Sequence, residues 1–213
     1  MEDQILIGKD HPVVKHHKAY GQELFPGFAY IDLLYQLFRE RGYDFARLEL
    51  LNLSIYNPLV VGQDLNVLLR VQCDETEAGR WQIRVEGQEQ RKGVLSPERK
   101  LHITAEMHLC DPLTFDEVLN ISRIKQTAAR SVSLDSFYAQ CRHQELVHTG
   151  FMLADGVVYE GENGASYIEI ALGDEARRSA EGFMFHPTLI DGSGVGTGVL
   201  FDNTNEEEQR LFL

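Results

Sequence analysis

Two polar side chains stand where the sequence is otherwise strongly apolar, and together they could move protons. His17 precedes the apolar segment FAYIDLLYQLF (28–38), and Asp191 lies inside a second, mostly apolar segment (188–201). A histidine base facing a carboxylic acid across an apolar slot could take an α proton and protonate a departing β-hydroxyl. The carboxyl must be protonated for this, and burial in an apolar slot raises the pKa of an aspartate in the required direction.

Each of these residues also has an interpretation without chemistry. His17 could be a solvated loop histidine. Asp191 could lie on an exposed helix turn or at a helix start, because LIDGSG (189–194) also fits a turn. Asp32, a third carboxylate in an apolar run, is predicted to be a first-turn acid that offsets the helix dipole.

Two further patterns are weak. His11, His16 and His17 could suggest a metal site, but no carboxylate or cysteine stands near them at helical ligand spacing, so we expect no metal. The segment GSGVGTG (192–198) has the glycine content of a phosphate loop but lacks its Lys-Ser/Thr ending and follows no clear strand. We expect neither a nucleotide nor a flavin.

Composition bounds the class of protein. The chain has 213 residues with 43% hydrophobic residues, which predicts one large domain or two small ones with a sizeable core. Its formal net charge of -13 disfavours nucleic-acid and membrane partners. The three cysteines form no CxxC pair, and the N-terminus lacks a signal pattern. We therefore expect a cytoplasmic globular protein.

The elements that must position His17 begin with a helix over 28–41. Pro26 and Gly27 mark its start, and Gly42 stands where a C′ glycine would end it. The apolar positions of this segment run almost all the way round the helix. We therefore predict that other structure wraps it.

Long strands follow this helix. Apolar residues predict strands in 48–61, with a turn at Asn57-Pro58, and alternation predicts them in 65–73, 81–85 and 101–109. The alternation in 101–109 places His102 and His108 on the solvated face. A sheet curled around one central helix, a hotdog fold, buries the helix and one sheet face together.

The second half weakly repeats this pattern of a helix and alternating strands. Residues 111–130 are predicted to be a linker with a short helical turn, and Ser133 is the predicted N-cap of a helix over 134–142. Strands over 156–161 and 166–172 flank a hairpin signal at Asn163-Gly164. The His-Pro before the 188–201 segment then suggests two copies of one fold.

At this point the chain resembles the dehydratase domains of modular polyketide synthases, double hotdogs related to the fatty-acid synthase dehydratase. The family's first motif, H-x-x-x-G-x-x-x-x-P, stands as His17, Gly21 and Pro26, and its second, H-P-x-x-x-D, as His186, Pro187 and Asp191. The stretches HPVV (11–14), FPGFAYIDLL (25–34) and Asn57-Pro58-Leu59 match the family as well. The similarity covers essentially the whole chain.

The resemblance implies an α+β double hotdog, divided into an N-terminal hotdog (1–112), a linker (113–132) and a C-terminal hotdog (133–213). It also implies a tunnel between the hotdogs that takes a β-hydroxyacyl chain. His17 would take the α proton, and Asp191 would protonate the departing hydroxyl. The protein needs no cofactor of its own, because the phosphopantetheine arm belongs to the acyl carrier protein.

Six residues are expected to shape the substrate site or bind the substrate: Gly21, Pro26, Gly27, His186, Pro187 and Val195. By the resemblance, Gly21 would keep the His17 loop tight and Pro26 would set the helix entry. Backbone N–H groups near Gly27 would polarise the thioester carbonyl.

The chain departs from the family in three places. Val195 stands four residues after Asp191, where the family usually has Gln or His, and valine cannot make that hydrogen bond. HTGFM (148–152) replaces a Tyr-Gly-Pro-x-Phe stretch. Few residues follow Asp191, so the second hotdog is expected to be incomplete at the C-terminus, either as a crop of a longer domain or as a half completed by another polypeptide.

The leading hypothesis is a hydro-lyase that dehydrates β-hydroxyacyl thioesters in polyketide biosynthesis. The alternatives are a dehydratase-like domain that shifts a double bond, cyclises or branches the chain, a non-catalytic scaffold, and an interaction module whose sheet edge captures a strand. Expected partners are the acyl carrier protein, neighbouring synthase domains, and a second copy or a chain that supplies strands. Docking would use a basic patch in 91–100 or at Arg177-Arg178.

Overall fold

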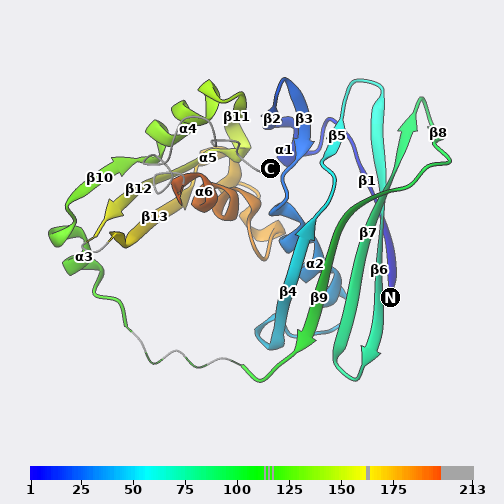
Figure 1. The fold of residues 1–213 in the computed structure, drawn as a ribbon, viewed down its shortest axis with the longest axis horizontal. Coiled ribbons are helices and arrows are strands. Elements are labelled where there is room, and N and C mark those ends of the chain that lie inside the picture. The colour runs from blue at the N-terminus through cyan, green and yellow to red at the C-terminus, as the bar shows by residue number, and fades with distance from the viewer. Residues whose placement is uncertain (113, 115, 117, 162–163, 198–213) are drawn as a thin grey trace.

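The computed structural model describes all residues except 113, 115, 117, 162–163 and 198–213. Two halves lie side by side, each with helices against an antiparallel sheet (Figure 1). The first half holds a six-stranded sheet of long strands around α2 (Ala29–Glu40). The second holds a three-stranded sheet with α4 (Leu134–His143) and α6 (Pro187–Thr197). This arrangement confirms the predicted α+β double hotdog.

The large sheet runs in the order β1-β6-β7-β9-β4, with β8 paired to β7. Its strands are β1 (Glu2–Ile7), β4 (Leu48–Ile55), β6 (Leu65–Glu77), β7 (Arg80–Arg91), β8 (Val94–Leu95) and β9 (Lys100–Leu109). Their inward side chains form one core with α2, which has no exposed residue between positions 29 and 38. The prediction of a wrapped helix is therefore confirmed, because the apolar ring of α2 is covered on all sides.

The predicted end of this helix is also confirmed. Gly42 has a φ of +86°, and its amide bonds to the Arg39 carbonyl at 2.9 Å. The Tyr43 amide reaches the Phe38 carbonyl at 3.1 Å. These two bonds form a Schellman motif, which needs a residue that tolerates a left-handed backbone at the C′ position.

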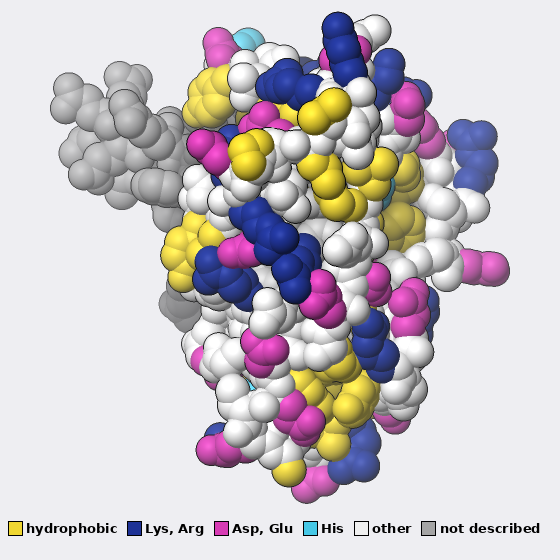
Figure 2. Space-filling view, turned by 90° about the vertical axis from the view of Figure 1, so that its right-hand side faces the viewer, with side chains coloured by type: hydrophobic (Ala, Val, Ile, Leu, Met, Phe, Trp, Pro, Cys, Tyr) yellow, Lys and Arg dark blue, Asp and Glu magenta, His cyan; other side chains and the backbone are white. Residues whose placement is uncertain are grey.

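The outer face of the large sheet carries mixed charges. Basic and acidic side chains are interspersed on the face that Figure 2 shows. Three of its closest ion pairs are Arg70–Glu2 at 2.7 Å, Arg84–Glu86 at 2.8 Å and Lys100–Glu89 at 2.8 Å. Most of the basic side chains there are therefore balanced locally, although the whole chain is acidic.

One strand residue differs from the predicted alternation. The β7–β9 register shifts at His102, which stands as an extra residue in β9. This bulge turns its side chain inward, where Nδ1 lies 3.0 Å from the Asn57 carbonyl oxygen. The prediction of a solvated His102 was wrong for this reason. His108 is partly exposed and faces Glu106 at 3.1 Å.

The segment around His17 is a β-hairpin rather than the predicted loop. β2 (His17–Ala19) and β3 (Gln22–Phe25) pair within a four-stranded sheet of order β11-β2-β3-β5, where β5 is Leu59–Val61 and β11 is Leu146–His148. Tyr20 and Gly21 form the tip with φ of +51° and +74°. Positive φ at both central residues is the signature of a tight type I′ turn. Because β11 belongs to the second half, this sheet joins the two halves.

The second half follows the predicted elements closely. The sheet has the order β10-β12-β13, with β10 (Arg130–Ser133), β12 (Ala154–Glu160) and β13 (Ser166–Leu172). Ser133 caps α4 by accepting the Asp135 amide at 3.2 Å, as predicted. The predicted linker contains α3 (Ile121–Thr127). The domain boundaries at 112 and 132 remain a prediction.

Two predicted features reach outside the described residues. Gly164 of the hairpin signal has a φ of +75°, but Asn163 is not described. The second apolar segment is helical as far as Thr197, and positions 198–201 lie outside the description, as does the C-terminal stretch EEEQRLFL. The remaining short elements are α1 (Pro12–Lys15), α5 (Asp174–Arg177) and the 3-10 turns Phe45–Arg47, Gly150–Met152 and Ala180–Gly182.

Candidate active site

His17 is a buried histidine held in one orientation. Its residue is 2% exposed, and Nδ1 lies 3.1 Å from the Leu24 carbonyl oxygen of the neighbouring strand. A carbonyl only accepts, so Nδ1 carries the proton and Nε2 keeps a free lone pair. Burial lowers the pKa of His17, while the nearby Asp191 charge raises it and His148 lowers it. The net result is a pKa below the ordinary value, so the imidazole stays neutral and has a lone pair that can accept a proton.

Asp191 reaches the same place from α6. Its side chain is 13% exposed, and its carboxylate lies in a group with His17 and His148 whose polar atoms are all within 4.8 Å of one another. The structure therefore brings together the two residues that the sequence predicted as base and acid. They come from β2 in the first half and α6 in the second.

The close approach of α6 depends on its glycines. A Cβ at Gly194 would lie 3.1 Å from the Phe28 ring, just before α2. At Gly192 and Gly196 it would lie 2.9 and 2.8 Å from Ile170 and Ile168 of β13. Larger residues would push α6 away from β13 and α2, and Asp191 would move with it.

His148 is the site residue that the sequence analysis missed. It pairs directly with His17 across β11 and β2, and the two rings have centroids 5.0 Å apart. Its Nε2 lies 2.8 Å from Asp191 Oδ2, although the approach is not aligned as a hydrogen bond. The only signal in the sequence was the HTGFM stretch, which differs from the family's pattern. We expected this difference to change the shape of the substrate tunnel, and we predicted no role for its histidine.

Apolar and aromatic groups enclose this group. The Tyr138 ring lies 5.1 Å from the His148 ring, and its hydroxyl accepts the Ala154 amide at 3.1 Å. Burial raises the pKa of Tyr138 to about 12, so it stays neutral as a wall of the site. Val195, one turn after Asp191, packs into the apolar clusters around Leu134 and around Leu24. It brings no polar atom to the carboxylate.

The other predicted binding residues lie around the site in different ways. Gly21 is exposed at the hairpin tip, and Pro26 is buried before α2. The turn at Gly27 passes close to Ile55, where a Cβ would lie 2.3 Å from Cδ1. The Ala29 and Tyr30 amides bond to the Pro26 and Gly27 carbonyls, at 3.0 and 3.3 Å. The roles of these residues toward a substrate remain predictions.

His186 and Pro187 begin α6. His186 packs between Phe183 and Phe151, with ring centroids 4.5 and 5.1 Å away, and its Nδ1 accepts the Thr188 amide at 3.3 Å. Burial lowers the pKa of His186, with Asp32 acting in the opposite direction. Pro187 is the first residue of α6, where a missing amide hydrogen costs no helix bond. Both residues therefore fix the start of the helix that carries Asp191.

Two neighbours of the predicted residues have separate structural partners. His16 Nε2 pairs with Glu175 at 3.1 Å, and its Nδ1 lies 3.0 Å from the Thr149 hydroxyl. Asp32 is in the first turn of α2, as predicted, but it is buried and accepts the Met184 and Phe185 amides at 2.7 and 2.8 Å. Its main effect is therefore to tie α2 to the chain entering α6, beyond any effect on the helix dipole.

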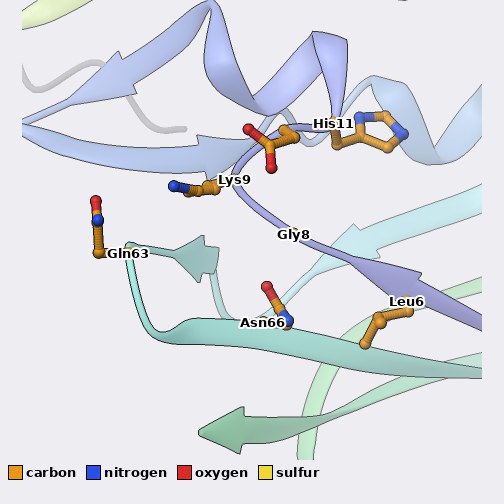
Figure 3. Close-up of a pocket in the computed structure, with 7 residues that line it drawn as sticks. Leu6, Gly8, Lys9, His11, Gln63 and Asn66 are labelled. Atoms are coloured by element: carbon orange, nitrogen blue, oxygen red, sulfur yellow. The ribbon is translucent and has the colours of Figure 1, made fainter. Parts of the chain in front are cut away.

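A hollow of the described surface lies elsewhere. It has a volume of about 460 Å³ between the end of β1 and the turn after β5, and is lined by Leu6, Gly8, Lys9, Asp10, His11, Gln63 and Asn66 (Figure 3). None of these is one of the three clustered side chains, so this hollow is not the place of the predicted acid and base.

Two imidazoles and a carboxylate, as in the group of His17, His148 and Asp191, are also a donor set that a divalent metal can use. The expectation of a metal-free site therefore remains a prediction.

Comparisons with known proteins agree with this arrangement. The family model described as polyketide synthase dehydratase domain matches residues 3–88. A crystal structure of a monomeric dehydratase domain from a trans AT polyketide synthase split module is 48% identical, with a TM-score of 0.95 over 100% of this chain and 78% of that one. The chain belongs to the polyketide synthase dehydratase domain family.

Two further relatives extend the comparison. Polyketide synthase PksL of Bacillus subtilis (strain 168) is 49% identical over 210 residues, which are 99% of this chain and 5% of that synthase. The dehydratase domain therefore corresponds to a small part of that much longer protein. An N-terminal dehydratase from the difficidin assembly line is 23% identical over 94% of this chain and 70% of that one, and its TM-score of 0.85 shows the same fold.

Proposed function

We propose that this dehydratase domain removes water from β-hydroxyacyl thioesters carried on an acyl carrier protein, giving an α,β-unsaturated acyl chain. The observation that most supports this proposal is that His17 and Asp191, from different halves of the molecule, meet at one buried place. Its family membership supports the same reaction. A scaffold or strand-capturing module would have no need for this buried base and acid.

The proton balance follows from the geometry. His17 Nε2 takes the α proton, because its Nδ1 is committed to the Leu24 carbonyl. Asp191 gives its proton to the β-hydroxyl, the C–O bond breaks, and water leaves. The His17 proton then has to return to Asp191 before the next turnover. The same pair could shift a double bond, but no observation favours that reaction over dehydration.

The partners follow from the thioester substrate. The phosphopantetheine arm of the carrier protein would deliver the acyl chain, and no cofactor of the domain itself is proposed. The two predicted docking patches are partly neutralised, since Lys100 pairs with Glu89 and Arg177 with Asp174. We therefore expect weak docking, with the acyl chain supplying much of the specificity.

No helix of the described residues is long and apolar enough to cross a membrane, and we propose a cytoplasmic location.

The test uses a β-hydroxyacyl group loaded on a carrier protein and followed by intact mass. Loss of one water in the presence of the domain, and no loss with His17→Ala, would support dehydration. Activity that survives EDTA would show that the three clustered side chains work without a metal. A wild-type domain that folds, binds the loaded carrier and releases no water would contradict the proposal.

A further inference from the structure

We infer that His148 is a positioning residue for the acid: it holds the Asp191 carboxyl toward His17 while the proton is transferred. This inference rests on the proposed dehydration. It assigns a role in this domain to a residue that the sequence motifs do not contain.

The backbone places His148 rigidly. β11 pairs with β2 in the register Leu146–Ala19, Val147–Lys18 and His148–His17, so the two histidines stand directly opposite each other. The residue is 2% exposed, and its ring lies between the rings of His17 and Tyr138 at 5.0 and 5.1 Å. An imidazole enclosed in this way has few alternative orientations, which is what a positioning group needs.

Asp191 has no other polar support among the described residues. Its Oδ2 is buried without a hydrogen bond, and the nearest polar side-chain atom is His148 Nε2 at 2.8 Å. The next residue on the same face of α6, Val195, packs into apolar clusters. A buried carboxyl without a partner is costly, so a small rotation that aligns the Nε2 contact would satisfy both groups.

The proton count is consistent with a neutral pair. With the acidic proton on Asp191 Oδ1, a neutral His148 can donate its Nε2–H to Oδ2, which leaves the acidic proton free for the β-hydroxyl. When Asp191 protonates the departing hydroxyl, His17 has just gained the α proton, so the site holds one cation and one carboxylate with His148 between them. Return of the His17 proton to Asp191 restores the starting state, and no proton is gained or lost at His148.

The test compares two substitutions at His148 with the same two at His102, a buried histidine in the β9 bulge outside the site. Glutamine keeps a polar group near the position of Nε2, whereas phenylalanine keeps only the ring. We expect His148→Phe to lower kcat about 10–100-fold with KM changed less than about threefold, and His148→Gln to retain most of the rate. His102→Phe and His102→Gln should leave kcat unchanged.

A structural role would give a different ranking. If His148 only fills space, phenylalanine should be tolerated as well as or better than glutamine, and kcat should follow the melting temperature; that ranking would overturn the inference. Equal, wild-type kcat in both His148 variants would overturn it as well.

A second readout separates this inference from the proposed function. In NMR spectra of the wild-type domain at one fixed pH, the His148 Nε2 signal should show the shift of a hydrogen-bonded imidazole, and Asp191→Leu should remove that shift. If the wild type proves inactive, the proposed function fails while this measurement still tests the pair. Identical His148 ring signals in both proteins would overturn the inference even for an active domain.

Discussion

Asp32 and Asp191 lie on the two central helices, and they differ in how fully their carboxylates are bonded. Asp32 on α2 accepts two backbone amides and the side-chain amide of Gln36. Asp191 on α6 has one close partner, His148, and that contact is not aligned as a hydrogen bond. A carboxylate with several hydrogen bonds to both oxygens is part of the framework, whereas one left open can exchange a proton with a substrate.

The largest expected effect is a loss of activity on changing Asp191, which distinguishes it from Asp32. Asp191→Asn removes the acid without changing the size of the side chain, so dehydration should fall about 10²–10⁴-fold. The thermal stability should stay near that of the wild type, because the asparagine side chain can keep the contact with His148 Nε2. Water loss by intact mass and melting by circular dichroism measure the two quantities. A stable variant with wild-type turnover would remove Asp191 from the reaction.

Asp32→Ala should show the opposite pattern. Two partly buried backbone amides would lose their acceptor, so the free energy of unfolding should drop by about 2–3 kcal/mol. Denaturant unfolding measures this drop, and Asp32→Asn is the matched control because its amide oxygen can still accept both amides. If Asp32→Ala unfolds like the wild type, the tie between α2 and the chain entering α6 carries no stability.

The pH dependence sharpens the role of His17. Its pKa lies below the ordinary value of 6.5, mainly because it is buried, so the base stays neutral below that pH. Activity should therefore be retained as the pH falls past 6.5 and be lost only at the lower pKa of the folded state. Stability has the same sign: the unfolded chain binds the proton first, so stability falls as the pH drops through 6.5. A rate profile with an acid limb above 6.5 would contradict a buried neutral base.

The smallest effect concerns the hairpin that carries His17. Gly21 is exposed with a φ of +74°, so Gly21→Ala should cost about 1 kcal/mol of unfolding free energy through backbone strain alone. Gly182→Ala is a matched control, since it also has open space around it but no positive φ. Equal stability of the two variants would show that the tight turn at Gly21 is not needed to hold β2 and β3.

Much of the fold could be predicted because local patterns and global packing agree. The ring of apolar residues in 28–38, the Gly42 C′ position and the Ser133 cap each specify their elements without distant contacts. His102 was mispredicted because a bulge, which depends on pairing with β7, shifts its side chain inward. The His17 segment was predicted as a loop because its strands are short, three and four residues, and depend on pairing with one another and with β5 and β11.

The sequence by itself predicted His17 as the base and Asp191 as the acid, but not the strand on which His17 lies. Only the tertiary structure decided which polar side chain supports the acid. His148 follows a short strand pattern that gives no hint of its partner, because its contact with Asp191 exists only when β11 pairs with β2 and the glycines of α6 let that helix approach. Such a contact depends on the packing of segments far apart in the chain, and local residue patterns carry no record of it.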